Sequence, residues 1–278
     1  MGGRRQFAAA ALITMGALTF ATAGAAGAAQ ARTPVSAMTP VSAMTEVTAI
    51  PRTASASTAS PGPFIAPGKT LKLGAKGAAV KTLQARLKEL GYVPGKLDGK
   101  YGGATLTAVW AFQKVQGIKP TSTVARRTWR ALESPKAPRI LVPKGKQDRV
   151  EVNLTLQVMV LYRGGVPKLI THISSGSGIP YTEHAMWNGK LQTFSGDART
   201  PTGNFKTTWR RSGWHRSYLG QLYNPIFFYN GIAFHGALSV PLYPASHGCV
   251  RLPMHVAEIL PGMLGTGVPV HVRGRFIR

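Results

Sequence analysis

The segment ASHGCVRL at residues 245–252 contains Cys249, the only cysteine among 278 residues. His247 lies two residues before it, and Gly248 separates the two. A cysteine without a partner in its own chain is an inert buried side chain, which is its commonest state, an intermolecular link, or a nucleophile whose proton a nearby imidazole removes. The residues around Cys249 therefore decide whether this thiol does chemistry.

A second histidine lies upstream. His235 ends the apolar segment GIAFH, 14 residues before Cys249, and we expect it at the rigid end of a strand. Such a pair would make thiolate and imidazolium available at neutral pH. Gly248 would let the N–H groups of residues 247–249 turn toward a reacting carbonyl as an oxyanion hole. No carboxylate is near His235 in the sequence, so we expect the backbone carbonyl of Gly236 to orient the imidazole.

Two other kinds of site use the same residue types. His235, His247 and Cys249 are all zinc ligands in other proteins, but their spacing matches no common zinc signature and a fourth ligand is missing. We therefore expect neither a metal nor a cofactor. Cysteine peptidases of the papain kind place the cysteine before the histidine, whereas here His235 comes first.

The start of the chain is typical of a secretory signal peptide over residues 1–31. Arg4 and Arg5 precede a small apolar run at 7–20, and an Ala-Gln-Ala cleavage site ends at Ala31. The run is too short for a membrane span, so we expect a secreted, wall-associated protein with no stable span after cleavage. Arg-Arg-Gln-Phe at 4–7 leaves the export route open. Exported proteins normally pair their cysteines, which makes a single one notable.

The charge balance indicates anionic partners. Lys and Arg number 34 against 9 Asp and Glu, a formal net charge of +25. A field of this sign attracts polyanions, and an exported protein meets anionic wall polymers. We expect no nucleic-acid partner, because no zinc-ligand set or basic helix suited to a groove is present. Dispersed basic residues that only maintain solubility remain the alternative.

Composition divides the chain into domains. Residues 32–68 are rich in Pro, Ser, Thr and Ala, and include the near-repeat TPVSAM, TPVSAM, TEVTAI, which is typical of a flexible tether. Residues 69–134 hold three apolar patterns of helical spacing, at 78–90, 104–117 and 124–132. They predict a small all-α three-helix domain.

The remaining segment, 146–273, predicts a mainly-β, sandwich-like domain. RVEVNLTLQVMVLY at 149–162 alternates as one half-buried strand, and RGGV at 163–166 turns it into a returning strand. GIAFHG and VPVHVR add short strands at 231–236 and 268–273. One helix is expected near 254–264, interrupted by Pro261.

Motifs in the small domain resemble those of three-helix peptidoglycan-binding domains. They are Leu-Gln at 83–84, LGY at 90–92, DGKYG at 98–102, Ala-Val at 108–109, Phe-Gln at 112–113 and TWRAL at 128–132. This resemblance implies a wall-binding role for residues 69–134.

Motifs in the larger domain resemble the L,D-transpeptidase catalytic domain: TPTGNF at 200–205, HG at 235–236 and SHGCVRL at 246–252. The resemblance implies that Cys249 is the nucleophile and His235 the general base, then acid. It also implies that the backbone of residues 247–249 forms the oxyanion hole. The side chains expected to shape the pocket are those of Ser246, His247 and Arg251.

The reaction implied by this resemblance is acyl transfer between peptidoglycan stem peptides, one a donor and one an acceptor, giving 3→3 cross-links through a cysteine thioester without a cofactor. Two alternatives stay open. Water could replace the acceptor amine, making the protein an L,D-carboxypeptidase or endopeptidase on the same site. A non-catalytic wall-binding protein would use residues 69–134 alone.

Overall fold

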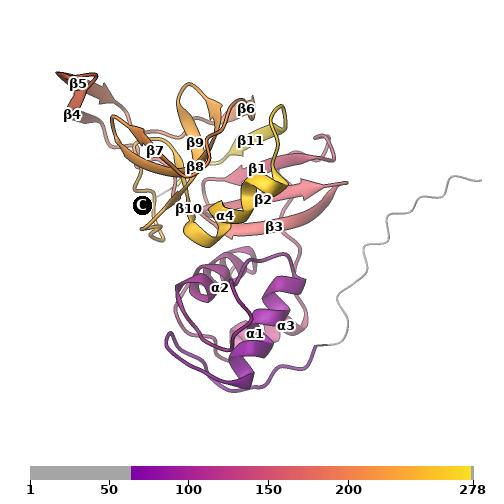
Figure 1. Ribbon diagram of the computed structural model, residues 1–278. Coiled ribbons are helices and arrows are strands. Elements are labelled where there is room, and N and C mark those ends of the chain that lie inside the picture. The colour runs from indigo at the N-terminus through magenta and orange to yellow at the C-terminus, as the bar shows by residue number, and fades with distance from the viewer. Residues whose placement is uncertain (1–63, 277–278) are drawn as a thin grey trace, which may run out of the picture. The chain divides into compact units, whose positions relative to one another are not determined.

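A computed structural model describes residues 64–276, so the predicted signal peptide and nearly all of the predicted linker lie outside the described residues. Helices α1 (Ala78–Glu89), α2 (Gly103–Val115) and α3 (Arg126–Glu133) come first. The rest of the chain forms α4 (Met254–Met263) and the strands β1 (Arg149–Asn153), β2 (Val158–Arg163), β3 (Val166–His172), β4 (Tyr181–Trp187), β5 (Lys190–Gly196), β6 (Gly203–Lys206), β7 (Trp214–Ser217), β8 (Gly220–Tyr229), β9 (Ile232–Ala237), β10 (Val250–Pro253) and β11 (Pro269–Arg273). The expected class, a three-helix domain followed by a mainly-β domain, is confirmed (Figure 1).

The helical domain encloses its own apolar core. Val80, Leu83 and Leu87 recur on one face of α1 and are fully buried. Gln84 on the same helix donates to Asp98 and Thr105 and accepts the N–H of Gly99. The Gly-rich connection between α1 and α2 is thereby held by one buried amide side chain.

Two sheets form the β domain. The five-stranded sheet has the order β3-β2-β1-β11-β6 and the four-stranded sheet the order β10-β9-β8-β7. Their facing residues share one core, which α4 completes with Val256, Ala257 and Leu260. No helix within residues 64–276 is long and apolar enough to cross a membrane.

Two local predictions were wrong. The alternating segment 149–162 forms two antiparallel strands, β1 and β2, because Asn153 Oδ1 accepts the N–H of Leu156 and Gln157 adopts a positive φ of 52°. An asparagine that closes a turn in this way offers the backbone an alternative to the ladder. Helix α4 also continues through Pro261. Proline leaves the carbonyl four residues earlier without its helical donor, and here Asn224 Nδ2 donates to that carbonyl of Ala257.

A hairpin that the sequence analysis did not anticipate forms a two-stranded sheet of its own. β4 and β5 pair in antiparallel register and project from the rest of the domain (Figure 1). Asn188 and Gly189 join them with φ of 51° and 74°, the conformation that a two-residue hairpin turn requires.

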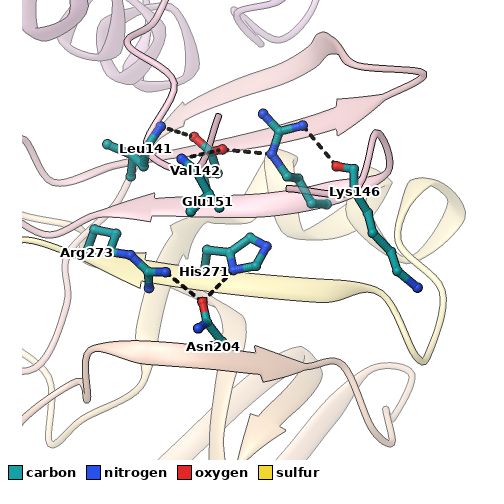
Figure 2. A network of polar contacts seen from close by, with 8 residues as sticks. Leu141, Val142, Lys146, Glu151, Asn204, His271 and Arg273 are labelled. Atoms are coloured by element: carbon teal, nitrogen blue, oxygen red, sulfur yellow. Dashed lines mark hydrogen bonds and ion pairs between the residues drawn. The ribbon is translucent and has the colours of Figure 1, made fainter. Parts of the chain in front are cut away.

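A buried polar network ties the connection between the two domains to the five-stranded sheet (Figure 2). Glu151 on β1 accepts the N–H groups of Leu141 and Val142 and the Nε–H of Arg149. Arg149 also lies over the ring of Tyr162 at 3.9 Å. Only 1% of Glu151 is exposed, so its partners replace the water that the carboxylate lost on folding.

Removing that carboxylate should destabilise the protein. Glu151→Ala leaves the Arg149 guanidinium buried without its counter-charge and frees two amides. We expect the free energy of unfolding to fall by about 3 kcal/mol, measured by urea denaturation. Asp197→Ala breaks the exposed pair with Arg199 and is the control, with no measurable change expected. Equal losses in the two variants would contradict a special role for the buried pair.

Candidate active site

Most of the predicted site residues line one cavity of about 1060 Å³. Of the seven, five line it: His235, Ser246, His247, Cys249 and Arg251. Gly236 and Gly248 do not line it, but each holds a neighbour in place, as described below. β9 and β10 run parallel with His235 opposite Arg251, which brings the two ends of the 14-residue connection to the same edge.

His235 is held in a defined orientation. It lies within β9, is 4% exposed, and its Nδ1 lies 2.9 Å from the carbonyl oxygen of Gly236. A carbonyl only accepts, so Nδ1 carries the proton and Nε2 is left with its lone pair. Gly236 also permits close packing, since a Cβ there would come within 2.8 Å of the Cβ of Ala257 on α4.

Cys249 lies immediately before β10 and is half-buried against Leu222, Phe227 and Ala233. Its Sγ contacts the carbonyl oxygen of Gly231 at 3.8 Å. Within residues 64–276 the thiol makes no hydrogen bond to His235, and no three His, Cys, Asp or Glu side chains gather closely enough to hold a metal ion. Cys249 and His235 both line the cavity.

The electrostatics of this pair differ from the sequence-based prediction. Burial lowers the pKa of His235 to about 4, opposed by the hydrogen bond to Gly236 and helped by the charge of Arg251. Burial also raises the pKa of the Cys249 thiol, against a smaller lowering by a backbone hydrogen bond and by Arg251. At neutral pH the resting pair is therefore a neutral thiol and a neutral imidazole, rather than thiolate and imidazolium. Proton transfer must accompany attack.

The turn before Cys249 is braced from within. Ser246 Oγ accepts the N–H of Gly248 and donates to the carbonyl of Cys249, and Ser246 is buried. Gly248 has a φ of 133°, which only glycine adopts without strain. Ser246 therefore shapes the turn itself. Because the Gly248 amide is already engaged, the expected oxyanion donors reduce in this state to the amides of His247 and Cys249.

Thr200, the first residue of the TPTGNF motif, supports the same turn from outside. Its Oγ1 donates to the carbonyl of Gly248 at 2.6 Å and accepts the N–H of Gly176 at 2.8 Å. The TPTGNF motif carries the family resemblance, but nothing in the sequence indicates a role for its first threonine. The structure shows how a segment 48 residues away fixes the backbone beside Cys249.

Thr200→Val should slow the reaction of Cys249 more than it destabilises the fold. Valine keeps the shape of the threonine side chain but leaves the Gly248 carbonyl and the Gly176 amide without their partner, so the turn before Cys249 shifts. We expect about a tenfold lower acylation rate constant, measured by intact-mass time courses. Thr207→Val is a matched control: Thr207 is also buried, donates to the Gly265 carbonyl and accepts the Val268 amide, away from the cavity. A similar slowing in both variants would contradict the assignment.

His247 links the turn to the hairpin. Its ring packs edge-on against Tyr181 at 4.6 Å, and its Nε2 lies 3.7 Å from Oε1 of Glu183. Both partners belong to β4, so the hairpin contacts the segment that carries the thiol. His247 therefore lines the pocket as expected and also contacts the β4 hairpin, which was not predicted from the sequence. The signal was present, because an Asn-Gly pair such as Asn188-Gly189 is typical of a two-residue hairpin turn.

Aromatic side chains extend the cavity beyond Cys249. Trp209 stacks on Phe227 at 3.7 Å, and Trp214 and Tyr218 line the wall while remaining partly exposed. Arg199, Arg216 and Arg251 add positive charge to the same lining, against the single carboxylate of Asp197. The site therefore offers a thiol, a base and a largely cationic, aromatic wall, which suits acyl transfer on an extended substrate.

Comparison with known proteins identifies the family. Residues 147–272 match the family model of the L,D-transpeptidase catalytic domain, and residues 76–132 match that of a peptidoglycan binding domain. A crystal structure of the L,D-transpeptidase from Xylanimonas cellulosilytica is 36% identical, with a TM-score of 0.65, and the match covers 74% of this chain and 98% of that one. The chain belongs to the L,D-transpeptidase family.

Other similarities are narrower. An L,D-transpeptidase structure from Stackebrandtia nassauensis is 25% identical, with a TM-score of 0.41 and coverage of 74% of this chain and 96% of that one. An uncharacterised Kitasatospora aureofaciens protein is 43% identical over 58 residues, 20% of this chain. The chain spans about half the length of that curated relative, 49%.

Proposed function

We propose that this L,D-transpeptidase forms 3→3 cross-links in peptidoglycan through a thioester on Cys249. The observation that carries the proposal is the shared cavity wall of Cys249 and His235, with the lone pair of His235 Nε2 left available by the Gly236 carbonyl. A thiol with a raised pKa needs such a base, and His235 is buried on β9, which pairs with the strand β10 that follows Cys249.

Attack and proton transfer are one event in this scheme. The Cys249 sulfur bonds to the carbonyl carbon of the third stem residue while Nε2 of His235 takes the thiol proton. The C–N bond to the terminal D-Ala then breaks, and the imidazolium returns the proton to the departing amine. In this scheme the amides of His247 and Cys249 stabilise the intermediate oxyanion.

The second half-reaction releases the enzyme. The side-chain amine of an acceptor stem attacks the thioester carbonyl, and His235 removes the amine proton. The C–S bond breaks and the thiolate recovers that proton. The partly exposed aromatic wall leaves room for a second stem beside the acylated cysteine.

The segments that precede the catalytic domain would bring it to the cell wall. We propose that residues 1–31 direct export, that 32–68 act as a tether, and that 69–134 bind the wall beside the catalytic domain at 146–273. The basic surface would add attraction to anionic wall polymers, which salt should weaken.

Muropeptides carrying tetrapeptide stems test the reaction. Full-length protein should convert them into dimers lighter than two substrates by one D-Ala, detected by mass spectrometry, and Cys249→Ala should not. Tripeptide monomers alone would show that water is the acceptor and would replace the cross-linking proposal with carboxypeptidase activity. No change in any stem would leave the wall-binding function alone.

A further inference from the structure

A buried pair outside the cavity connects the two domains. Lys114 on α2 is 8% exposed, and its Nζ lies 2.9 Å from His172 Nδ1 and 3.2 Å from the carbonyl oxygen of Gln157. His172 ends β3 and is fully buried, with the ring of Trp110 edge-on at 5.4 Å. Within residues 64–276, Lys114 makes no salt bridge to a carboxylate. A buried amine without a counter-charge is costly and needs a reason.

The partners of His172 fix its tautomer. The Val240 carbonyl only accepts, so Nε2 carries the proton, and Nδ1 accepts from Lys114, whose pKa burial lowers to about 7. Nε2 lies 3.0 Å from the carbonyl oxygen of Val240, to which it donates. Burial first, and then the charge of Lys114, lower the pKa of His172 to about 3, so the ring stays neutral and keeps this arrangement at neutral pH. The direction of donation therefore runs from the helical domain to Val240.

Val240 belongs to the segment that joins the two site residues. Residues 238–248 connect His235 on β9 to Cys249 before β10, and Leu238 and Tyr243 within them are largely exposed. The neighbours of His172 hold the other half, because Ser174 Oγ donates to the Tyr243 carbonyl and the Ser175 carbonyl accepts the amides of Ala245 and Ser246. The half next to His235 is held through Val240.

We propose that Lys114 is a positioning residue for the reaction: through His172 it fixes the Val240 carbonyl and with it the segment between His235 and Cys249. The helical domain is then part of the support of the active site as well as a wall-binding domain. This inference rests on the proposed acylation of Cys249. Because the thiol makes no hydrogen bond to His235 in the resting state, small shifts of this segment decide how often one forms.

The geometry of the domain contact favours such a role. The Ile170 amide on β3 donates to the Gly91 carbonyl, and Tyr92 and Phe112 share a core with Val158 and Ile170. The two domains are therefore packed together at β3, and Lys114 enters next to this core. His255 on α4 makes another hydrogen bond between the domains, and its partner is the carbonyl of Val93 rather than a group of the 238–248 segment.

The test measures carbapenem acylation of the full-length protein by intact mass, separating the limiting rate constant from the half-saturating concentration. Lys114→Met keeps the apolar stem and removes the donor. We expect the limiting rate constant to fall about tenfold at an unchanged half-saturating concentration. His255→Leu is the matched control, which removes a domain hydrogen bond elsewhere and should acylate at the wild-type rate.

Variants of His172 test whether Lys114 acts through this histidine, even if Lys114→Met folds poorly. An amide can accept from Lys114 and donate to Val240, so His172→Gln should retain most of the rate, whereas His172→Leu should lose about as much as Lys114→Met. The double variant should lose no more than His172→Leu alone.

Two results would overturn the inference: equal slowing by Lys114→Met and His255→Leu, or wild-type rates in both Lys114→Met and His172→Leu. An unacylated wild-type protein would instead overturn the proposed function on which the inference rests.

Discussion

Cys249→Ser should abolish the covalent adduct that a carbapenem forms on the native protein. The family resemblance implies a sulfur nucleophile able to open the strained lactam, and Cys249 is the only thiol in the chain. Serine keeps the shape but is a far weaker nucleophile beside a base whose pKa burial lowers to about 4. Intact-mass analysis should show one drug-sized adduct on the wild type and none on the variant.

Prior alkylation of Cys249 by iodoacetamide should block that adduct, which controls for the site of the reaction. An inert, buried Cys249 would give a different result. Cys249 is half-buried against Leu222, Phe227 and Ala233, so an inert thiol would resist both reagents in the folded protein and react after denaturation. In that case the transpeptidase proposal falls, and wall binding is the better account of the chain.

Residues that act through their near neighbours in the sequence could be predicted. Cys249 and Gly248 stand together, and the carbonyl that orients His235 is that of the next residue, so the sequence alone indicated the hydrogen bond that the structure shows. Helix spacing and strand alternation likewise gave the order of domains, because burying one face is a local property of each segment.

Contacts across long separations could not be predicted. Glu183 reaches His247 over 64 residues, and Lys114 reaches His172 over 58, through pairings that only the folded sheets create. The sequence-based prediction of thiolate and imidazolium for Cys249 and His235 also differs from the structure. The protonation states depend on how deeply His235 and Cys249 are buried, and no pattern of residue types gives that depth.

His235→Ala should lower the acylation rate constant by about 10²–10⁴-fold while leaving the fold intact. Its Nε2 carries the lone pair that can accept the thiol proton. Because burial raises the pKa of the resting thiol, attack without a base is slow. His215→Gln is the matched control, because His215 lines the same cavity but packs on Trp209 and Phe227. Wild-type acylation in His235→Ala, together with loss in His247→Ala, would reverse the assigned roles.

The pH dependence separates general-base assistance by His235 from the reaction of an unassisted thiol. Burial holds the pKa of His235 at about 4, so the imidazole remains the unprotonated base as pH falls from 8 to 5. The wild-type acylation rate constant should therefore stay nearly flat over that range and drop only as pH passes through about 4. An unassisted thiol reacts as thiolate, and its rate would fall about tenfold for each pH unit below its pKa. A slope of that size between pH 7 and 5 in the wild type would contradict general-base assistance by His235, whereas we expect it in His235→Ala, where the base is gone.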